Sequence, residues 1–387
     1  MLGIMSGYKI IINASNIKYG GGLQVAVSVI SSLISNSRSM DCCFVVSQCV
    51  FDELAASGVP VSNIANVFVV TFEPFNVALM LSSLFKFKTI EKNFEPDLIF
   101  TIFGPGYYHS NSAINLVGFA NAWLVQPGSK AYSIYSLKNR LLNKLKNYVL
   151  ARLLYKSDCF YITESNAIAA DFCEYFGAPS TQISVISNCL SHYFTKEYYL
   201  NPFDYLLEDD RFKFVTITRN YPHKNLKVIP LIGKVLNSYG FRFVFVVTLS
   251  QSEYNAMSDD FKKYTINVGS VSIVDCPKLY DRCDALFLPT LIECFSVSYL
   301  EAMYKRLPIA TSDLAFAREV CPSGTYYFDP YDYLSISSSL MKLITENSSK
   351  NKCNVIEVFD QEVVSLYGSN ETRVDKYVNL MRSLLRG

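Results

Sequence analysis

Two glutamates, Glu293 and Glu301, stand eight residues apart where a strand-like run gives way to a helical pattern. The stretch reads LPTLIECFSVSYLEAM, so a strand is expected to end near Pro289 and a helix to begin at Ser296. Serine is a preferred N-cap residue, and the free N–H groups of a helix start attract anions such as phosphate. Glu301 could then accept hydrogen bonds from paired hydroxyls such as those of a ribose, and Glu293 could hold a hydroxylated sugar. From these residues alone, a solvated loop glutamate and a helix-surface glutamate remain an equally good explanation.

Two cations, Arg219 and Lys224, lie in the stretch TRNYPHKN at the end of another strand-like run. A departing diphosphate gains negative charge as the bond to it breaks, and fixed cations aimed at it stabilise that transition state. Arginine can bind two oxygens with its planar fork, whereas lysine supplies a point charge. Taken alone, the two residues fit an ordinary surface turn before a helix equally well.

Short apolar runs alternate with helical patterns along the whole chain, which is typical of a doubly wound parallel sheet. The first series of expected elements comprises strands at 8–13, 42–47, 67–71, 97–103, 113–118 and 159–163 and helices at 22–34, 78–93 and 165–176. The second series comprises strands at 212–218, 241–248, 285–289, 309–311 and 326–328 and a helix at 225–238. The sequence therefore predicts two Rossmann-like domains.

The stretch 188–210 holds Asn201-Pro202 and an acidic Glu-Asp-Asp run, and it is predicted to link the two domains. We expect an N-terminal domain over 1–198, a C-terminal domain over 199–370 and a C-terminal helix over 371–387 that is free to pack back on the first domain. Ligands of parallel sheets bind beyond the carboxyl ends of the strands, so an active site is expected in a cleft where the two domains face each other.

Composition narrows the function classes. Half of the residues are hydrophobic, and 35 Lys and Arg against 34 Asp and Glu give no charge bias toward nucleic acid. No apolar run approaches the roughly 18 residues that span a bilayer, and the start lacks the pattern of a signal peptide. The 11 cysteines include no C-x-x-C pair, which favours buried reduced thiols in a cytoplasmic protein. The three histidines lack ligand spacing and no D-x-D is present, so no metal is expected.

The two motifs together resemble glycosyltransferase family 4, retaining enzymes of GT-B fold. Residues 293–303 resemble the E-x7-E motif of that family, and 307–312 resemble the strand that follows it. The resemblance implies that Glu293, Arg219 and Lys224 are catalytic. It also implies that the donor is bound by Gly21, Gly22, Arg219, Lys224, Gly269, Val271, Phe295, Ser296, Val297 and Glu301. One departure is that Cys294 and Ser296 replace glycines often found beside the aromatic residue, so two side chains must fit close to the phosphates.

The resemblance extends over nearly the whole chain. Residues 161–165 and 176–188 look like the end of the family's first domain, and the glycine triplet at 20–22 looks like the loop that faces the donor. A bare glycine triplet is also common in tight strand-to-helix turns. Many relatives place a histidine near the transferred sugar. The corresponding stretch here, 118–123, has Asn121 as its hydrogen-bonding side chain, and an ordinary loop asparagine is an equally good interpretation.

The resemblance implies a glycosyltransferase that moves a sugar from a nucleoside diphosphate to an acceptor hydroxyl in surface-polysaccharide synthesis. The expected partners are a nucleotide-sugar and a glycan acceptor linked to polyprenyl diphosphate, with no nucleic acid and no cofactor. Two alternatives stay open. A nucleotide-sugar 2-epimerase shares the GT-B architecture and would turn over donor without acceptor. A non-catalytic sugar-binding subunit need not keep all four of the charged residues Glu293, Glu301, Arg219 and Lys224.

The segment 130–156 holds seven Lys or Arg, no Asp or Glu, and leucines at helical spacing. One interpretation is a helix that buries its leucines in the first domain. The other is a basic amphipathic surface that meets anionic lipid headgroups. A lipid-linked acceptor would give such a surface a purpose, so a cytoplasmic protein peripheral to the inner face of the membrane is expected.

Overall fold

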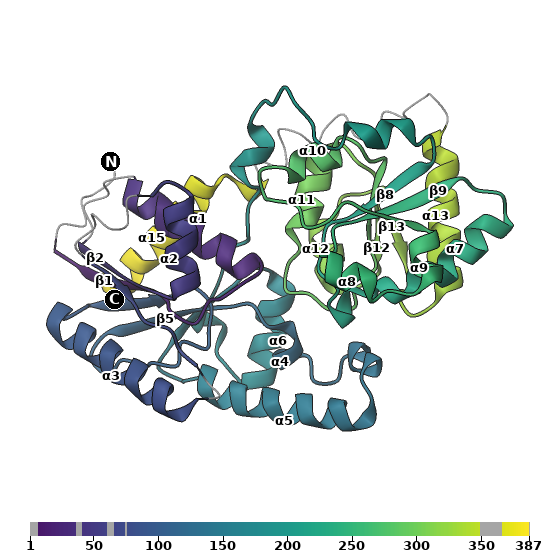
Figure 1. The fold of residues 1–387 in the computed structure, drawn as a ribbon. Helices are drawn as coiled ribbons and strands as arrows, with labels where there is room; N and C mark the ends of the chain where they lie inside the picture. The colour runs from purple at the N-terminus through teal and green to yellow at the C-terminus, as the bar shows by residue number, and fades with distance from the viewer. Residues whose placement is uncertain (1–6, 36–40, 60–65, 74–75, 349–365, 387) are drawn as a thin grey trace. The chain divides into compact units, whose positions relative to one another are not determined.

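The structure, a computed structural model, describes residues 7–35, 41–59, 66–73, 76–348 and 366–386. Contacts divide the chain into two compact units (Figure 1). The first comprises 1–128, 136–188 and 370–387, and the second comprises 129–135 and 189–369. No helix in the described part of the chain is long and apolar enough to cross a membrane.

A parallel sheet of seven strands forms the first unit, in the order β3-β2-β1-β4-β5-β6-β7. Its strands are β1 (Lys9–Ala14), β2 (Asp41–Val46), β3 (Val67–Val69), β4 (Leu98–Thr101), β5 (Ile114–Phe119), β6 (Phe160–Thr163) and β7 (Ile183–Val185). The six strands expected from the sequence are all present. The three-residue β7 was missed, because the serine in ISV interrupts its apolar run.

Helices cover both faces of this sheet because successive side chains of a strand point to opposite faces. In β1, Ile10 and Ile12 join the core under α1 (Gly21–Ser35), α2 (Gln48–Ala56) and α15 (Asn370–Arg386), whereas Ile11 joins the core under α3 (Val77–Phe94). The remaining helices of this unit are α4 (Ala122–Val125), α5 (Leu137–Leu154), α6 (Asn166–Phe176) and η3 (Ser180–Gln182).

The C-terminal helix α15 returns to the first unit, as the sequence allowed. Val374, Tyr377, Val378 and Met381 of α15 are buried in the same core as α1. The guanidinium of Arg373 bonds Asn188 Oδ1, and it donates to Ser28 Oγ at 2.6 Å. The end of the chain therefore belongs to the first half of the fold.

The second unit is a parallel sheet of six strands in the order β10-β9-β8-β11-β12-β13. Its strands are β8 (Phe212–Thr216), β9 (Phe243–Val247), β10 (Thr265–Asn267), β11 (Ala285–Leu288), β12 (Ile309–Ser312) and β13 (Tyr326–Phe328), and its helices are α7 (Ile229–Ser238), α8 (Gln251–Asn255), α9 (Asp259–Lys263), α10 (Cys276–Tyr280), α11 (Val297–Tyr304), α12 (Ala315–Val320) and α13 (Tyr333–Ser348). Of these strands only β10 was not expected. Val215 and Phe214 of β8 enter separate cores, so helices again cover both faces.

The boundary between the units lies ten residues earlier than expected, at 188/189 rather than 198/199. Leu190 and Phe194 are buried in the core of the second unit, and the ring of Phe194 meets that of Tyr280 edge-on at 5.7 Å. The expected linker thus carries two packed 3-10 turns, η4 (His192–Thr195) and η5 (Asp204–Glu208). Irregular structure of this kind leaves no period in the sequence. Residues 129–135, with η2 (Lys130–Ile134), also cluster with the second unit.

Candidate functional site

The structure brings Lys224 and Glu293 into contact through an ion pair between Lys224 Nζ and Glu293 Oε1. Glu293 follows β11 and Lys224 closes η6 (Pro222–Lys224), which follows β8. Because β8 and β11 are parallel neighbours, both residues lie beyond the same sheet edge. Their side chains are only 16% and 15% exposed. A charge pair of this kind, at the carboxyl ends of strands, is where an α/β sheet binds ligands.

The loop that carries Glu293 is fastened to the turn that carries Lys224. The carbonyl oxygen of His223 accepts from Leu291 N at 2.8 Å and from Thr290 Oγ1 at 3.3 Å, and Thr290 Oγ1 also lies 3.4 Å from Glu293 Oε1. Burial lowers the pKa of His223 to about 4, so its ring is neutral at pH 7. The sequence did not point to His223 or Thr290 as site residues. His223 holds the loop through its backbone carbonyl oxygen, which a residue of any type could supply.

Glu301 is buried at 7% exposure, so the helix-surface interpretation is wrong. Tyr280, the last residue of α10, donates its hydroxyl to Glu301 Oε2 at 2.8 Å. Burial raises the pKa of Glu301 to about 7, and the hydrogen bond from Tyr280 opposes that rise. A carboxyl group poised to titrate near neutral pH is a common mark of a functional site.

Ser296 occupies the N-cap position of α11, as predicted, but its side chain makes no capping hydrogen bond. Cys294, Phe295 and Ser296 are all buried, so both side chains that replace glycines are accommodated within the unit. The ring of Phe295 lies edge-on to that of Tyr367 at 5.9 Å. Val297, the first residue of α11, is half-buried. The residues that lead into α11 are therefore packed against the core of the second unit.

Arg219 is exposed and lies three residues after the end of β8. It is not part of the ion pair that Lys224 and Glu293 form. The next residue, Asn220, donates its backbone N–H to Glu253 Oε1 at 3.1 Å, and the charge of Arg219 acts on the same carboxylate. Gly269, with φ of 79°, and the half-buried Val271 follow β10 on this edge of the sheet. The left-handed backbone at Gly269 favours glycine.

The three remaining predicted site residues lie in the first unit. Gly21 and Gly22 begin α1 directly after the turn at Gly20, which has φ of 76°. Asn121 precedes α4, and its side chain makes no capping hydrogen bond. Gly118, at the end of β5, is required because a Cβ there would lie 1.8 Å from the Ile102 carbonyl oxygen. Gly21, Gly22 and Asn121 thus all follow the carboxyl ends of strands. That they bind the donor stays a prediction.

Among the described residues, one group could hold a metal ion: His109, Asp158 and Cys159. His109 Nε2 lies 3.1 Å from Asp158 Oδ2, and Cys159 Sγ lies 3.5 Å from His109 Nδ1. Burial raises the pKa of the Cys159 thiol to about 11. A neutral thiol and a histidine–carboxylate pair account for this group by hydrogen bonding alone.

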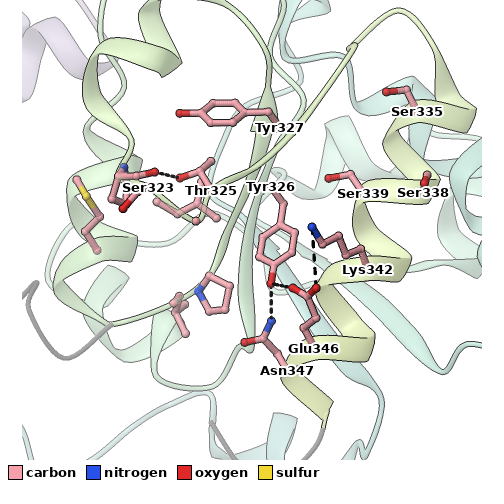
Figure 2. Close-up of a pocket in the computed structure, with 16 residues that line it drawn as sticks. Ser323, Thr325, Tyr326, Tyr327, Ser335, Ser338, Ser339, Lys342, Glu346 and Asn347 are labelled. Atoms are coloured by element: carbon pink, nitrogen blue, oxygen red, sulfur yellow. Dashed lines mark hydrogen bonds and ion pairs between the residues drawn. The ribbon is translucent and has the colours of Figure 1, made fainter. Parts of the chain in front are cut away.

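A cavity of about 740 Å³ opens in the second unit away from the predicted residues (Figure 2). It lies at the amino ends of β12 and β13, where Tyr326 donates its hydroxyl to Glu346 Oε2 at 2.6 Å and accepts from Asn347 Nδ2 at 3.3 Å. Lys224, Glu293 and Glu301 do not line it. Because ligands of parallel sheets bind at the carboxyl edge, the size of this cavity does not displace the predicted site.

Residues 200–356 match the family model of glycosyl transferases group 1. The O-antigen chain mannosyltransferase RfbU of Salmonella typhimurium is 24% identical over 189 residues, which cover 47% of this chain and 50% of that protein. The matched region thus spans half the length of this curated relative.

Solved structures share the fold over almost the entire chain. A glycosyltransferase from Rickettsia africae is 13% identical with a TM-score of 0.73, and it covers 98% of this chain and 99% of its own. Anabaena HepE in complex with UDP and glucose is 16% identical with a TM-score of 0.70, covering 97% and 100%. The GT-B fold and the resemblance to bacterial surface-polysaccharide glycosyltransferases are confirmed.

Proposed function

We propose that this protein is a retaining glycosyltransferase that moves a sugar from a nucleoside-diphosphate sugar to a hydroxyl of a lipid-linked glycan acceptor in surface-polysaccharide synthesis. The observation that carries the proposal is the Lys224–Glu293 ion pair at the carboxyl edge of the second sheet, together with the buried Glu301 in α11, the helix that follows the Glu293 loop. The complex of HepE with UDP and glucose, and the O-antigen role in the name of RfbU, support the donor and acceptor classes.

The charges of the site suggest how the donor is held. Without donor, Glu293 neutralises Lys224. A diphosphate that approaches this edge offers Lys224 a second anionic partner, so its binding would release the Glu293 carboxylate toward the hydroxyls of the sugar. Lys224 and Arg219 would then face the leaving diphosphate, where positive charge stabilises the transition state most. Because the chain itself supplies this charge, we propose that transfer needs no metal ion.

The nucleotide is identified by a thermal-shift panel of UDP, GDP, ADP and dTDP with the full-length protein. We expect one base to raise Tm, because a ligand at about 100 times its Kd stabilises the folded state by about 2.7 kcal/mol. Incubation of the selected nucleotide-sugar without acceptor separates the alternatives. An epimerase would convert the sugar, and a non-catalytic subunit would bind the donor and leave it unchanged even with acceptor present.

The membrane-facing surface is proposed on α5. The structure contradicts the interpretation that α5 buries its leucines, because only Ala151 and Leu154 of this helix are buried. The exposed apolar side chains of α5 are Leu137, Leu141, Leu142, Leu145, Tyr148, Val149 and Leu153. They alternate with exposed Lys138, Lys144 and Lys146. Helix α3, along the same lower edge of the first unit in Figure 1, exposes Val77, Leu81 and Phe85 at one-turn spacing. Such a surface suits an anionic membrane, because its apolar side chains can enter the lipid interface and its basic side chains are attracted to the headgroups.

Lys138→Glu with Lys146→Glu is expected to reduce binding to vesicles that contain about a third anionic lipid. Each basic residue near such a surface contributes about 1 kcal/mol, so two reversals should weaken binding by more than tenfold. Sedimentation with vesicles at low salt measures this. Lys227→Glu with Lys263→Glu, two exposed lysines of the second unit, makes the same change in net charge and should bind like the wild type. A wild-type protein that stays in the supernatant at low salt would rule out the membrane surface.

A further inference from the structure

The hydroxyl groups of Tyr280 and Ser298 form a chain of hydrogen bonds that ends on Glu301. The side chain of Tyr280 is fully buried, and its hydroxyl donates to Glu301 Oε2 at 2.8 Å. Ser298, in the first turn of α11, hydrogen-bonds the hydroxyl of Tyr280 in turn. Within the described ranges, Tyr280 is the side chain that hydrogen-bonds the Glu301 carboxyl group. The second carboxyl oxygen is thereby left for another partner.

Tyr280 is also the group that favours a charge on Glu301. Burial disfavours the ionised carboxylate, and the hydrogen bond from Tyr280 acts in the opposite direction. The titratable groups that face Glu301 come from α10 and are Tyr280 and Cys276. Burial raises the pKa of the Cys276 thiol far above neutral, so this thiol supplies no compensating charge. A hydrogen bond donated to an ionised group is stronger than one between neutral groups, so Tyr280 stabilises the charged form selectively.

We propose that Tyr280 is a positioning residue for the donor: its hydroxyl holds the Glu301 carboxyl group ionised and in one orientation, ready to accept hydrogen bonds from the paired hydroxyls of a ribose. The inference rests on the proposed function, since it takes Glu301 as the residue that binds the nucleoside. Tyr280 is too deeply buried to touch a ligand, so it acts through Glu301.

Tyr280→Phe tests this, because it removes the hydroxyl and keeps the ring that packs on Phe194. The Kd of the nucleoside diphosphate selected by the panel is measured by calorimetry from about pH 6 to about pH 9. Wild-type affinity should rise with pH through the pKa of Glu301, because the ionised carboxylate accepts hydrogen bonds from both hydroxyls. Without the tyrosine hydroxyl this pKa should increase by about one unit, so affinity falls about tenfold near pH 6.5 and recovers toward pH 9. KM for the donor should rise with kcat nearly unchanged.

Tyr299→Phe is the matched control. Tyr299 is equally buried and loses a hydrogen bond of the same 2.8 Å length, to Thr311 Oγ1, without contacting Glu301. It should keep the wild-type pH dependence. Equal behaviour of the two variants, or a loss in Tyr280→Phe that is the same at every pH, would reduce Tyr280 to a packing role and overturn the inference.

Two further variants separate the possible failures. If Tyr280→Phe does not fold, Ser298→Ala removes the outer link of the same chain and should shift the pH midpoint upward by a smaller amount, and an unshifted midpoint counts against the inference. Glu301→Gln should weaken nucleotide binding at all pH values and abolish its rise with pH. Unchanged affinity in Glu301→Gln would overturn the proposed nucleoside site itself. Weakened binding there, with wild-type behaviour of Tyr280→Phe, would overturn only the role of Tyr280.

Discussion

Glu293→Gln is expected to lower turnover by on the order of 10²-fold or more while leaving nucleotide binding intact or tighter. The carboxylate is expected to act on the sugar, so its loss removes an interaction that strengthens in the transition state. The same substitution ends the ion pair with Lys224, which then faces a diphosphate without an internal competitor. Steady-state kinetics with a defined acceptor, together with calorimetry of the nucleoside diphosphate, measure both effects.

Opposite directions for turnover and nucleotide affinity distinguish this result from simple damage to the fold. Glu346→Gln is the matched control, because Glu346 also accepts a short hydrogen bond but lies at the amino edge of the sheet, in the cavity of Figure 2. It should keep wild-type turnover. Wild-type turnover in Glu293→Gln, or a loss of nucleotide binding as large as the loss of turnover, would remove Glu293 from its proposed role.

The fold was predictable because its signal is local and repeated. Most of the buried parallel strands leave a short apolar run, whereas β7 (ISV) and β10 (TIN) include polar residues among their three positions and were missed. The boundary at 188/189 was missed because Leu190 and Phe194 are buried by irregular turns. The unit in which an apolar residue is buried depends on contacts with residues distant in sequence. A local sequence pattern does not show these contacts.

The candidate site was predictable only as residue types. Spacing indicated Glu293, Glu301, Arg219 and Lys224, but it could not show that Lys224 and Glu293 pair, because that contact joins residues 69 positions apart. Tyr280 was missed for the same reason, being 21 positions from Glu301 in another helix.

The pattern of α5 was also ambiguous from sequence. Helical spacing shows that the leucines share one face of the helix. It does not show whether that face packs on the protein or meets a lipid surface. The structure leaves that face of α5 exposed.

Lys224→Ala and Arg219→Ala are each expected to reduce turnover by on the order of 10²–10³-fold, the range for removing one preorganised charged donor. The loss should appear in kcat more than in donor affinity, because the charge on the leaving diphosphate is greatest in the transition state. Activity of the wild type should persist in EDTA, since the two side chains are proposed to supply the positive charge. Strict dependence on Mg²⁺ or Mn²⁺, with both substitutions silent, would mean that the diphosphate is held elsewhere.

The two cations should differ in what else their removal does. Arg219 is exposed, so Arg219→Ala should leave the free energy of unfolding within about 0.5 kcal/mol of the wild type. Lys224→Ala leaves Glu293 largely buried without its partner, which should cost stability as well as turnover. Adding Glu293→Gln to Lys224→Ala should restore much of that stability and none of the turnover, because the two groups are coupled in the folded protein and both are proposed to act in catalysis. Additive stability effects in this cycle, measured by denaturant unfolding, would show that the ion pair does not form in solution, and the proposed exchange of Glu293 for a diphosphate at Lys224 would fail with it.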